Sequence, residues 1–174
     1  MTKKELVEKY PKIFSIEEVD PRYPFPMFGI ECGEGWVGLL DKLCHHLQFN
    51  TDNNNSYSNE GTHPQIHVTQ VKEKYGGLRF YVNGASIEDY AIISFAESLS
   101  YGICEDCGKF KQDGDFTMDY EGWIYTLCND CKGKMIKKRK SHSTIYYLLS
   151  YKTTWWFRKY LIRSLWKQIK KKLT

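Results

Sequence analysis

The sequence lacks several features that define large functional classes. The longest uncharged stretch in its last forty residues, 141–151, is far shorter than the roughly 20 apolar residues that span a bilayer. Its first residues are charged and precede no apolar segment with a small-residue cleavage site, so we expect no signal peptide. It contains no P-loop, nucleophile-elbow or H-E-x-x-H motif. These absences favour a cytoplasmic protein that is not an enzyme; an enzyme of unrecognised type is the less favoured alternative.

Acidic residues are absent from the C-terminal part of the chain. Between Lys132 and Thr174 there are 14 Lys or Arg residues and no Asp or Glu. The preceding residues hold the other 11 basic residues and all 21 acidic ones, so an acidic body precedes a basic tail. This asymmetry indicates a polyanion or an anionic membrane surface as the partner of the tail. With 41% hydrophobic and 16% aromatic residues, the chain has enough apolar side chains to fold around a core.

The cysteines indicate a metal site. Without a secretion signal, six cysteines favour metal binding over disulfides. Four of them form two C-x2-C pairs, Cys104 with Cys107 and Cys128 with Cys131, separated by 20 residues. Two such turns can complete a tetrahedral Zn²⁺ site, which four thiolates would close, making the ion structural. Gly108 follows the first pair, where a positive φ would aim N–H groups at the sulfurs. An iron–sulfur cluster and a chance pair of unligated turns are the alternatives.

Hydrophobic periodicity predicts an α+β fold around a small antiparallel sheet. The helix expected from Ser86, which is its N-cap with Asp89 three residues on, has an apolar stripe of Ile92, Phe95, Ala96 and Leu99. Helices are also expected at residues 3–10 and 33–48, a long mobile loop at 49–65, a strand at 123–127 and a helix from residue 128 towards 140. With the first cysteine pair before them, this strand and this helix follow the order of elements in a treble-clef or ribbon-like zinc module. We therefore divide the chain into an α+β body (1–103), a four-cysteine zinc module packed on it (104–140) and a basic aromatic helical extension (141–174).

Two strand-like runs flank Gly76-Gly77, which favours a hairpin with a type I′ turn at these two glycines. In that register Lys74 faces Arg79. Side-chain alternation gives a polar face of Gln70, Lys72, Lys74, Arg79 and Tyr81, and the last four of these residues are here called the basic face. The apolar face would hold Val71, Tyr75, Leu78, Phe80 and Val82, with Ile66 and Val68 out of phase, as a bulge or a two-sided core would produce.

The basic face has two interpretations. Like charges directly opposite each other cost roughly 0.2–1 kcal/mol per pair, and an anionic ligand would relieve that cost. Tyr81 could then stack on a base or a sugar. Alternatively, Glu31, Glu34 or Asp41 supplies the counter-charge, and the face is purely structural.

The tail has the pattern of a cationic amphipathic helix. Three interpretations remain open: binding to nucleic acid, docking on an anionic membrane, and packing on the acidic body. The apolar stripe consists of Leu161, Leu165, Ile169 and Leu173, and the candidate contact residues are Trp155, Trp156, Lys159, Arg163, Lys167 and Lys171.

The remaining Cys and His residues show no strong ligand spacing. Buried cysteines and partly exposed histidines are the favoured interpretation, and a second metal site is not expected. These residues are Cys32, Cys44, His45, His46, His63 and His67.

Four motifs between about Phe28 and Cys131 resemble a group of small zinc-containing proteins from phages and prophages. The polar loop before the hairpin is longer here, and the basic tail is an addition. The resemblance implies a phage-encoded protein acting in the bacterial cytoplasm and adds no mechanism. The motifs are Cys32-Gly33-x-Gly35-Trp36, Val71-Lys-Glu-Lys-Tyr-Gly-Gly-Leu-Arg-Phe-Tyr81, Cys104-x-x-Cys107-Gly108 and Gly122-Trp-Ile-x-Thr-Leu-Cys128.

Together these patterns predict a non-enzymatic, zinc-stabilised binding protein for an anionic nucleotide-type ligand or nucleic acid, interfering with host functions or defence. The alternative is an adaptor that binds a host protein or a membrane surface, in which zinc and hairpin serve only structure.

Overall fold

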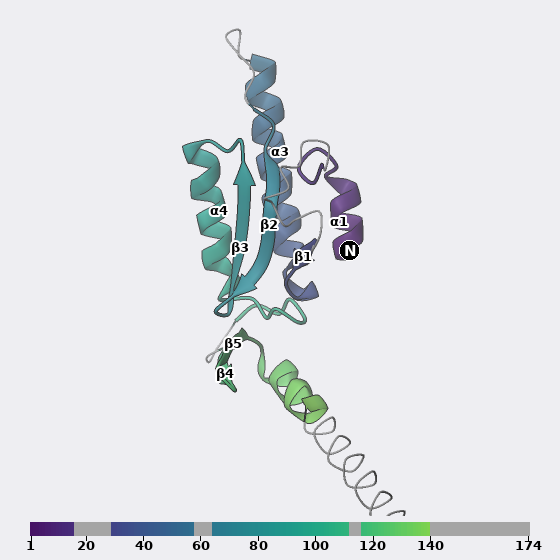
Figure 1. The fold of residues 1–174 in the computed structure, drawn as a ribbon, viewed down its shortest axis with the longest axis vertical. Helices are drawn as coiled ribbons and strands as arrows, with labels where there is room; N and C mark the ends of the chain where they lie inside the picture. The colour runs from purple at the N-terminus through teal and green to yellow at the C-terminus, as the bar shows by residue number, and fades with distance from the viewer. Residues whose placement is uncertain (16–28, 58–63, 112–115, 140–174) are drawn as a thin grey trace, which may run out of the picture. The chain divides into compact units, whose positions relative to one another are not determined.

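A computed structural model describes residues 1–15, 29–57, 64–111 and 116–139. The chain divides into two compact units, residues 1–132 and residues 133–174. The described part has an α+β fold, as predicted (Figure 1). Its elements are α1 (Lys3–Lys9), β1 (Ile30–Glu31), the 3-10 helix η1 (Glu34–Trp36), α3 (Val37–Tyr57), β2 (His67–Lys74), β3 (Gly77–Asn83), α4 (Ile87–Ser100), β4 (Thr117–Tyr120) and β5 (Trp123–Thr126).

The main sheet has the strand order β1-β2-β3, with β1 parallel and β3 antiparallel to β2. In Figure 1, α4 runs alongside β3 and α3 lies behind the sheet. Alternation of apolar residues along β2 and β3 turns one face of the sheet towards these helices. The largest fully buried side chains of this core include Leu6, Ile13, Trp36, Leu40, Leu47, Ile66, Val71 and Leu78.

Side chains of α4 cover the outer edge of β3. The Leu78 N–H donates to Ser100 Oγ at 2.9 Å, and the Phe80 N–H donates to Glu97 Oε1 at 2.8 Å. An open strand edge would expose these donors to pairing with another chain. The edge of β3 is therefore closed by a helix instead of a further strand.

The hairpin forms, but its turn lies one residue earlier in the chain than predicted, which shifts the strand pairing by two residues. Tyr75 and Gly76 occupy the turn, with φ of 54° and 77° as a type I′ turn requires. Consequently Lys72 faces Arg79, whereas the sequence prediction paired Lys74 with Arg79. Tyr75 is a turn residue with 67% of its surface exposed, and does not belong to the apolar face.

Tertiary contacts select this register. The Gly76 carbonyl accepts a hydrogen bond from Thr126 Oγ1 at 2.6 Å, and its N–H donates to Glu73 Oε1 at 2.6 Å. Gly77 begins β3 beside Tyr101, and a Cβ atom there would lie 2.4 Å from the Tyr101 ring. Gly77 therefore serves close packing, while Gly76 alone supplies the flexible turn residue.

The predicted irregularity further along the hairpin is confirmed. The pairing register shifts between Val68 and Gln70, which is a β-bulge. Because of this bulge, Val68 and Ile66 are both buried in the same core as Val71.

The polar segment after the predicted helix at 33–48 is partly helical, so the predicted loop at 49–65 is wrong over residues 49–57. α3 continues to Tyr57. Buried Thr51 donates to the Leu47 carbonyl at 3.0 Å, and Asp52 forms an ion pair with Lys12 at 3.1 Å. Contacts of this kind override the weak helix propensity of the Asn-rich sequence.

The predicted cap of α4 is confirmed, because Ser86 Oγ accepts from the Asp89 N–H and the Asp89 carboxylate accepts from the Ser86 N–H. Its predicted apolar stripe is right for Ala96, which is buried, and for Ile92, which packs against the core, and it is wrong for Phe95 and Leu99. Phe95 and Leu99 are 65% and 38% exposed, because the hydrogen bonds to β3 rotate the helix. The buried face consists of Asp89, Ile93, Ala96 and Ser100.

Candidate metal centre and the basic face

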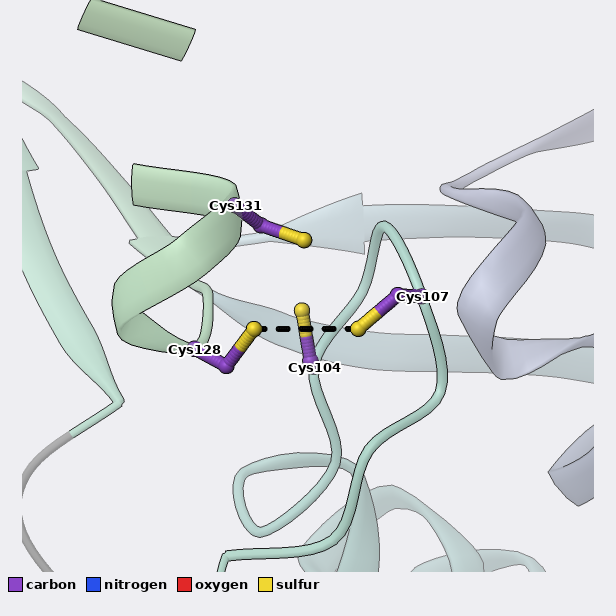
Figure 2. A group of neighbouring side chains, drawn as sticks. All are labelled: Cys104, Cys107, Cys128 and Cys131. Carbon is purple, nitrogen blue, oxygen red and sulfur yellow. Dashed lines mark hydrogen bonds between the residues drawn. The ribbon is translucent and has the colours of Figure 1, made fainter. Parts of the chain in front are cut away.

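The four cysteines of the two C-x2-C pairs are positioned to bind a metal ion. Their sulfurs lie within 4.8 Å of one another and point towards a common centre (Figure 2). Cys107 Sγ and Cys128 Sγ are 3.7 Å apart, and all four thiols are free of disulfides. Four converging thiolates suit a tetrahedral soft or borderline cation.

The first pair lies on a tight loop. The Gly108 N–H donates to the Cys104 carbonyl at 2.8 Å, and the Cys104 N–H donates to the Lys109 carbonyl at 2.9 Å. Gly108 has φ of 75°, which confirms the conformation predicted for it. A left-handed residue after the second cysteine closes the loop and keeps both sulfurs on one side.

The second pair lies where β5 gives way to a helix. β5 pairs with β4 up to Thr126, and residues 129–139 are helical, as predicted. The Lys132 N–H donates to the Cys128 carbonyl at 2.9 Å, so Cys128 and Cys131 share the first helical turn.

Burial and hydrogen bonding shift the pKa values of the Cys128 and Cys131 thiols in opposite directions. Burial raises the pKa of the Cys128 thiol, but hydrogen bonds from the Cys131 backbone N–H and the neighbouring thiols outweigh it, so its pKa falls to about 7. Burial raises the pKa of Cys131 far above its ordinary value. A bound cation would stabilise the thiolate form of its cysteine ligands.

Glu105 lies between Cys104 and Cys107 and connects the loop that carries these two cysteines to the body. Its carbonyl accepts from the Gly35 N–H at 2.7 Å, and its Oε1 accepts from the Gly33 N–H at 2.8 Å. Burial raises the pKa of this carboxyl. A Cβ atom at Gly35 would lie 2.3 Å from the Cys104 carbonyl oxygen, so only glycine permits this contact.

The sequence analysis missed the role of Glu105. The available signal was the pair of glycines at positions 33 and 35, which indicates that a backbone approaches closely there. Nothing local identified the approaching backbone as the cysteine loop. A second missed residue is Thr126, fully buried, which links β5 to the hairpin turn through the Gly76 carbonyl.

The other candidate ligands do not converge. Among the residues that the structure describes, the four cysteines are the only group of three or more Cys, His, Asp or Glu arranged to hold an ion. Burial raises the pKa of Cys32 to about 12 and that of Cys44 still further. His45 stacks on Phe49, and His67 Nδ1 is 2.9 Å from Ser15 Oγ, whereas His63 lies outside the described ranges.

The basic face lies on the outer side of the hairpin. Lys72 Nζ donates to Gln70 Oε1 at 2.6 Å and sits 5.4 Å from the centre of the Tyr81 ring. Arg79 donates to the Tyr101 hydroxyl at 3.2 Å, and this hydrogen bond raises the pKa of Arg79. Lys74 lies next to the turn, opposite Gly77.

Two of the three carboxylates that could neutralise the basic face form ion pairs with other lysines. Glu34 pairs with Lys3 at 3.8 Å, and Asp41 pairs with Lys9 at 2.7 Å. Glu31 is the register neighbour of Lys72 across β1 and β2. Within the described part of the chain, no carboxylate forms an ion pair with Lys72, Lys74 or Arg79.

The tail residues singled out in the sequence, from Trp155 to Leu173, lie outside the described ranges. Among the helices that the structure describes, none combines the length and apolarity needed to cross a membrane. No protein-family model, curated protein or solved structure matches this chain.

Proposed function

We propose that this protein is a zinc-stabilised, non-enzymatic binding protein whose ligand is an anionic nucleotide, free or within a nucleic acid strand. The ligand would bind the basic face, defined above as Lys72, Lys74, Arg79 and Tyr81. The resemblance to phage and prophage proteins supports action inside an infected bacterial cell, where binding would interfere with host functions.

The cysteine cluster supports zinc in a structural role. Four protein thiolates would fill a tetrahedral coordination shell and leave no position for a substrate. The order of cysteine loop, β4–β5 hairpin and helix supports a treble-clef type of module. Zinc would then hold the loop that carries Glu105 against the body, as a scaffold for the hairpin.

The observation that carries the binding proposal is the charge of the face. Lys72 lies directly opposite Arg79, and Lys74 lies two residues further along the same strand, so three basic residues occupy neighbouring positions of the two strands. Like charges facing each other across two strands destabilise a sheet. An anion bound between them would remove the repulsion and would gain charge-assisted hydrogen bonds.

The aromatic residue of the face adds a preference for nucleotides over simple anions. Tyr81 is 44% exposed, and its ring is already approached by Lys72. An exposed aromatic ring beside cations provides both stacking and phosphate neutralisation, the two contributions that dominate binding of single strands.

The test compares two charge variants against a labelled eight-nucleotide single strand, measured by fluorescence anisotropy over a series of salt concentrations. Arg79→Gln should weaken binding about tenfold or more and reduce the slope of log affinity against log salt by about 0.7, as expected for one lost phosphate contact. Lys4→Gln, which removes an exposed cation of α1, is the matched control and should change neither. The tail is identical in all variants.

The structural alternative gives a different result. If Glu31 neutralises the face, Arg79→Gln should change the melting temperature and leave affinity and salt slope as they are in the unaltered protein. That outcome would refute the basic face as a ligand site.

A further inference from the structure

A hollow of about 330 Å³ lies where the turns of the two hairpins meet. It is lined by residues 73–75 of the β2–β3 hairpin and by residues 122–124 of the β4–β5 hairpin. Its size falls at the lower end of small-molecule sites, which span about 300–1,000 Å³. The hollow adjoins the basic face, because Lys74 belongs to both.

Two large aromatic side chains line this hollow while remaining mostly exposed. Tyr75 and Trp123 are 67% and 65% exposed. Neither the Tyr75 hydroxyl nor the Trp123 indole N–H has a hydrogen-bond partner among the described residues. Large aromatic rings in such positions contribute little to folding, and they are typical of surfaces that bind a partner ring.

The backbone at Tyr75 gives independent support. Its φ of 54° lies in the left-handed region, which is unfavourable for a bulky side chain and natural for glycine or asparagine. A tyrosine at position 75 therefore places an aromatic ring on the turn but makes the turn less stable than glycine or asparagine would. Unfavourable backbone geometry of this kind is concentrated at functional sites.

The hollow is held open by fixed contacts between the turns. Thr126 Oγ1 donates to the Gly76 carbonyl at 2.6 Å, and a Cβ atom at Gly76 would lie 3.0 Å from the Ile124 side chain. The one carboxylate in the lining, that of Glu73, accepts from the Gly76 N–H. The backbone segments that carry the two aromatic walls are thus fixed relative to each other, which reduces the entropic cost of binding.

We propose that this hollow binds the base of the nucleotide whose phosphate contacts the basic face. The base would lie against Tyr75 and Trp123, with Lys74 at the rim directing the phosphate towards Lys72 and Arg79. This inference rests on the proposed function and specifies its ligand, since a planar ring is required in addition to an anion.

The experiment is an NMR titration of the full ¹⁵N-labelled chain with two probes, AMP and ribose 5-phosphate, which carries a phosphate and no base. The reporters are the Gly122 amide and the Trp123 indole N–H, assigned by the loss of the indole signal in Trp123→Phe. AMP should shift both reporters and bind roughly 5- to 150-fold more tightly than ribose 5-phosphate, the range for one stacked base.

Two variants test whether the preference for AMP depends on the aromatic ring of Tyr75. Tyr75→Gly removes the ring and suits the turn better, so the protein should fold at least as well and lose most of its preference for AMP. Phe95→Ala is the matched control, because Phe95 is equally exposed but lies on α4, outside the hollow. It should bind AMP like the unaltered chain.

The outcomes separate the two proposals. Equal affinity for both probes, dependent on Arg79 and without shifts at Gly122 or Trp123, would overturn the base site and support the basic face. AMP binding that shifts the reporters and is unchanged by Arg79→Gln would support the hollow and overturn the phosphate site. No binding of either probe would overturn both.

Discussion

Loss of the metal is expected to destabilise the body of the protein as well as the cysteine module. Cys107→Ser is the most direct perturbation. Cys107 is exposed whereas the other three cysteines are buried, so the substitution removes a ligand without opening a cavity in the core. Binding energy at such a site is folding energy, since the ligands converge only in the folded chain.

The size of the effect follows from the hydrogen bonds that join the cysteine-bearing segments to the body. Each contributes about 0.5–1.5 kcal/mol, so the loss of three would lower the free energy of unfolding by about 1.5–4.5 kcal/mol. That is a large share of the roughly 5–15 kcal/mol that stabilises a typical domain. The three are Gly33 N–H to Glu105 Oε1, Gly35 N–H to the Glu105 carbonyl, and Thr126 Oγ1 to the Gly76 carbonyl.

Three measurements check this prediction. Metal content is determined by elemental analysis of the purified chain, and thermal unfolding by circular dichroism should show a melting temperature lower by about 5–20 °C. Hydrogen exchange read by mass spectrometry should show faster exchange in peptides that contain Gly33 and Gly35, although both residues are distant in sequence from the substitution.

The control is Cys44→Ala, which removes a buried thiol of α3 that is not among the converging sulfurs. It should retain the metal and the slow exchange at Gly33 and Gly35. The reasoning is refuted if Cys107→Ser loses the metal while the melting temperature and the exchange of those two amides stay unchanged.

Two further predictions concern the body. Gly35→Ala would force a Cβ atom to within 2.3 Å of the Cys104 carbonyl oxygen and should cost about 1–3 kcal/mol in urea unfolding. Gly38→Ala, where nothing lies within 4 Å, should stabilise α3 by about 0.5–1 kcal/mol; equal effects would contradict the packing argument. The Lys9 ammonium holds the pKa of Asp41 below its ordinary value, so its stabilising contribution is present above about pH 4 and is lost as the pH falls through the lower folded pKa. Asp41→Asn should therefore lower the melting temperature at pH 7 more than at pH 2.5, and an equal loss at both would exclude the charge as the cause.

The sequence by itself determined the features that depend on neighbouring residues. The two C-x2-C pairs, the left-handed Gly108 and the Ser86 cap are set by local backbone geometry, and the structure has all three. The strand and the helix around Cys128 were likewise predictable, because short runs of apolar residues and the cysteine spacing constrain them. The bulge followed from the phase of the apolar residues in β2.

The tertiary structure alone decided whether the hairpin turn consists of Gly76 and Gly77, as predicted, or of Tyr75 and Gly76, as found. Both Gly76 and Gly77 could supply a positive φ, and local sequence does not distinguish them. The hydrogen bond from Thr126 and the packing of Tyr101 select the turn at Tyr75 and Gly76, and this one-residue shift of the turn places Lys72 opposite Arg79 and exposes Tyr75.

Long-range contacts also set the length of α3, the rotation of α4 and the site between the two turns. Phe95 is exposed because two hydrogen bonds to β3 orient α4. Glu105 connects the cysteine loop to the body because it accepts hydrogen bonds from the N–H groups of two glycines that lie more than sixty positions earlier in the sequence. Periodicity reports which residues share a face of an element. It does not report which face the neighbouring element covers, because that depends on contacts whose partners are distant along the chain.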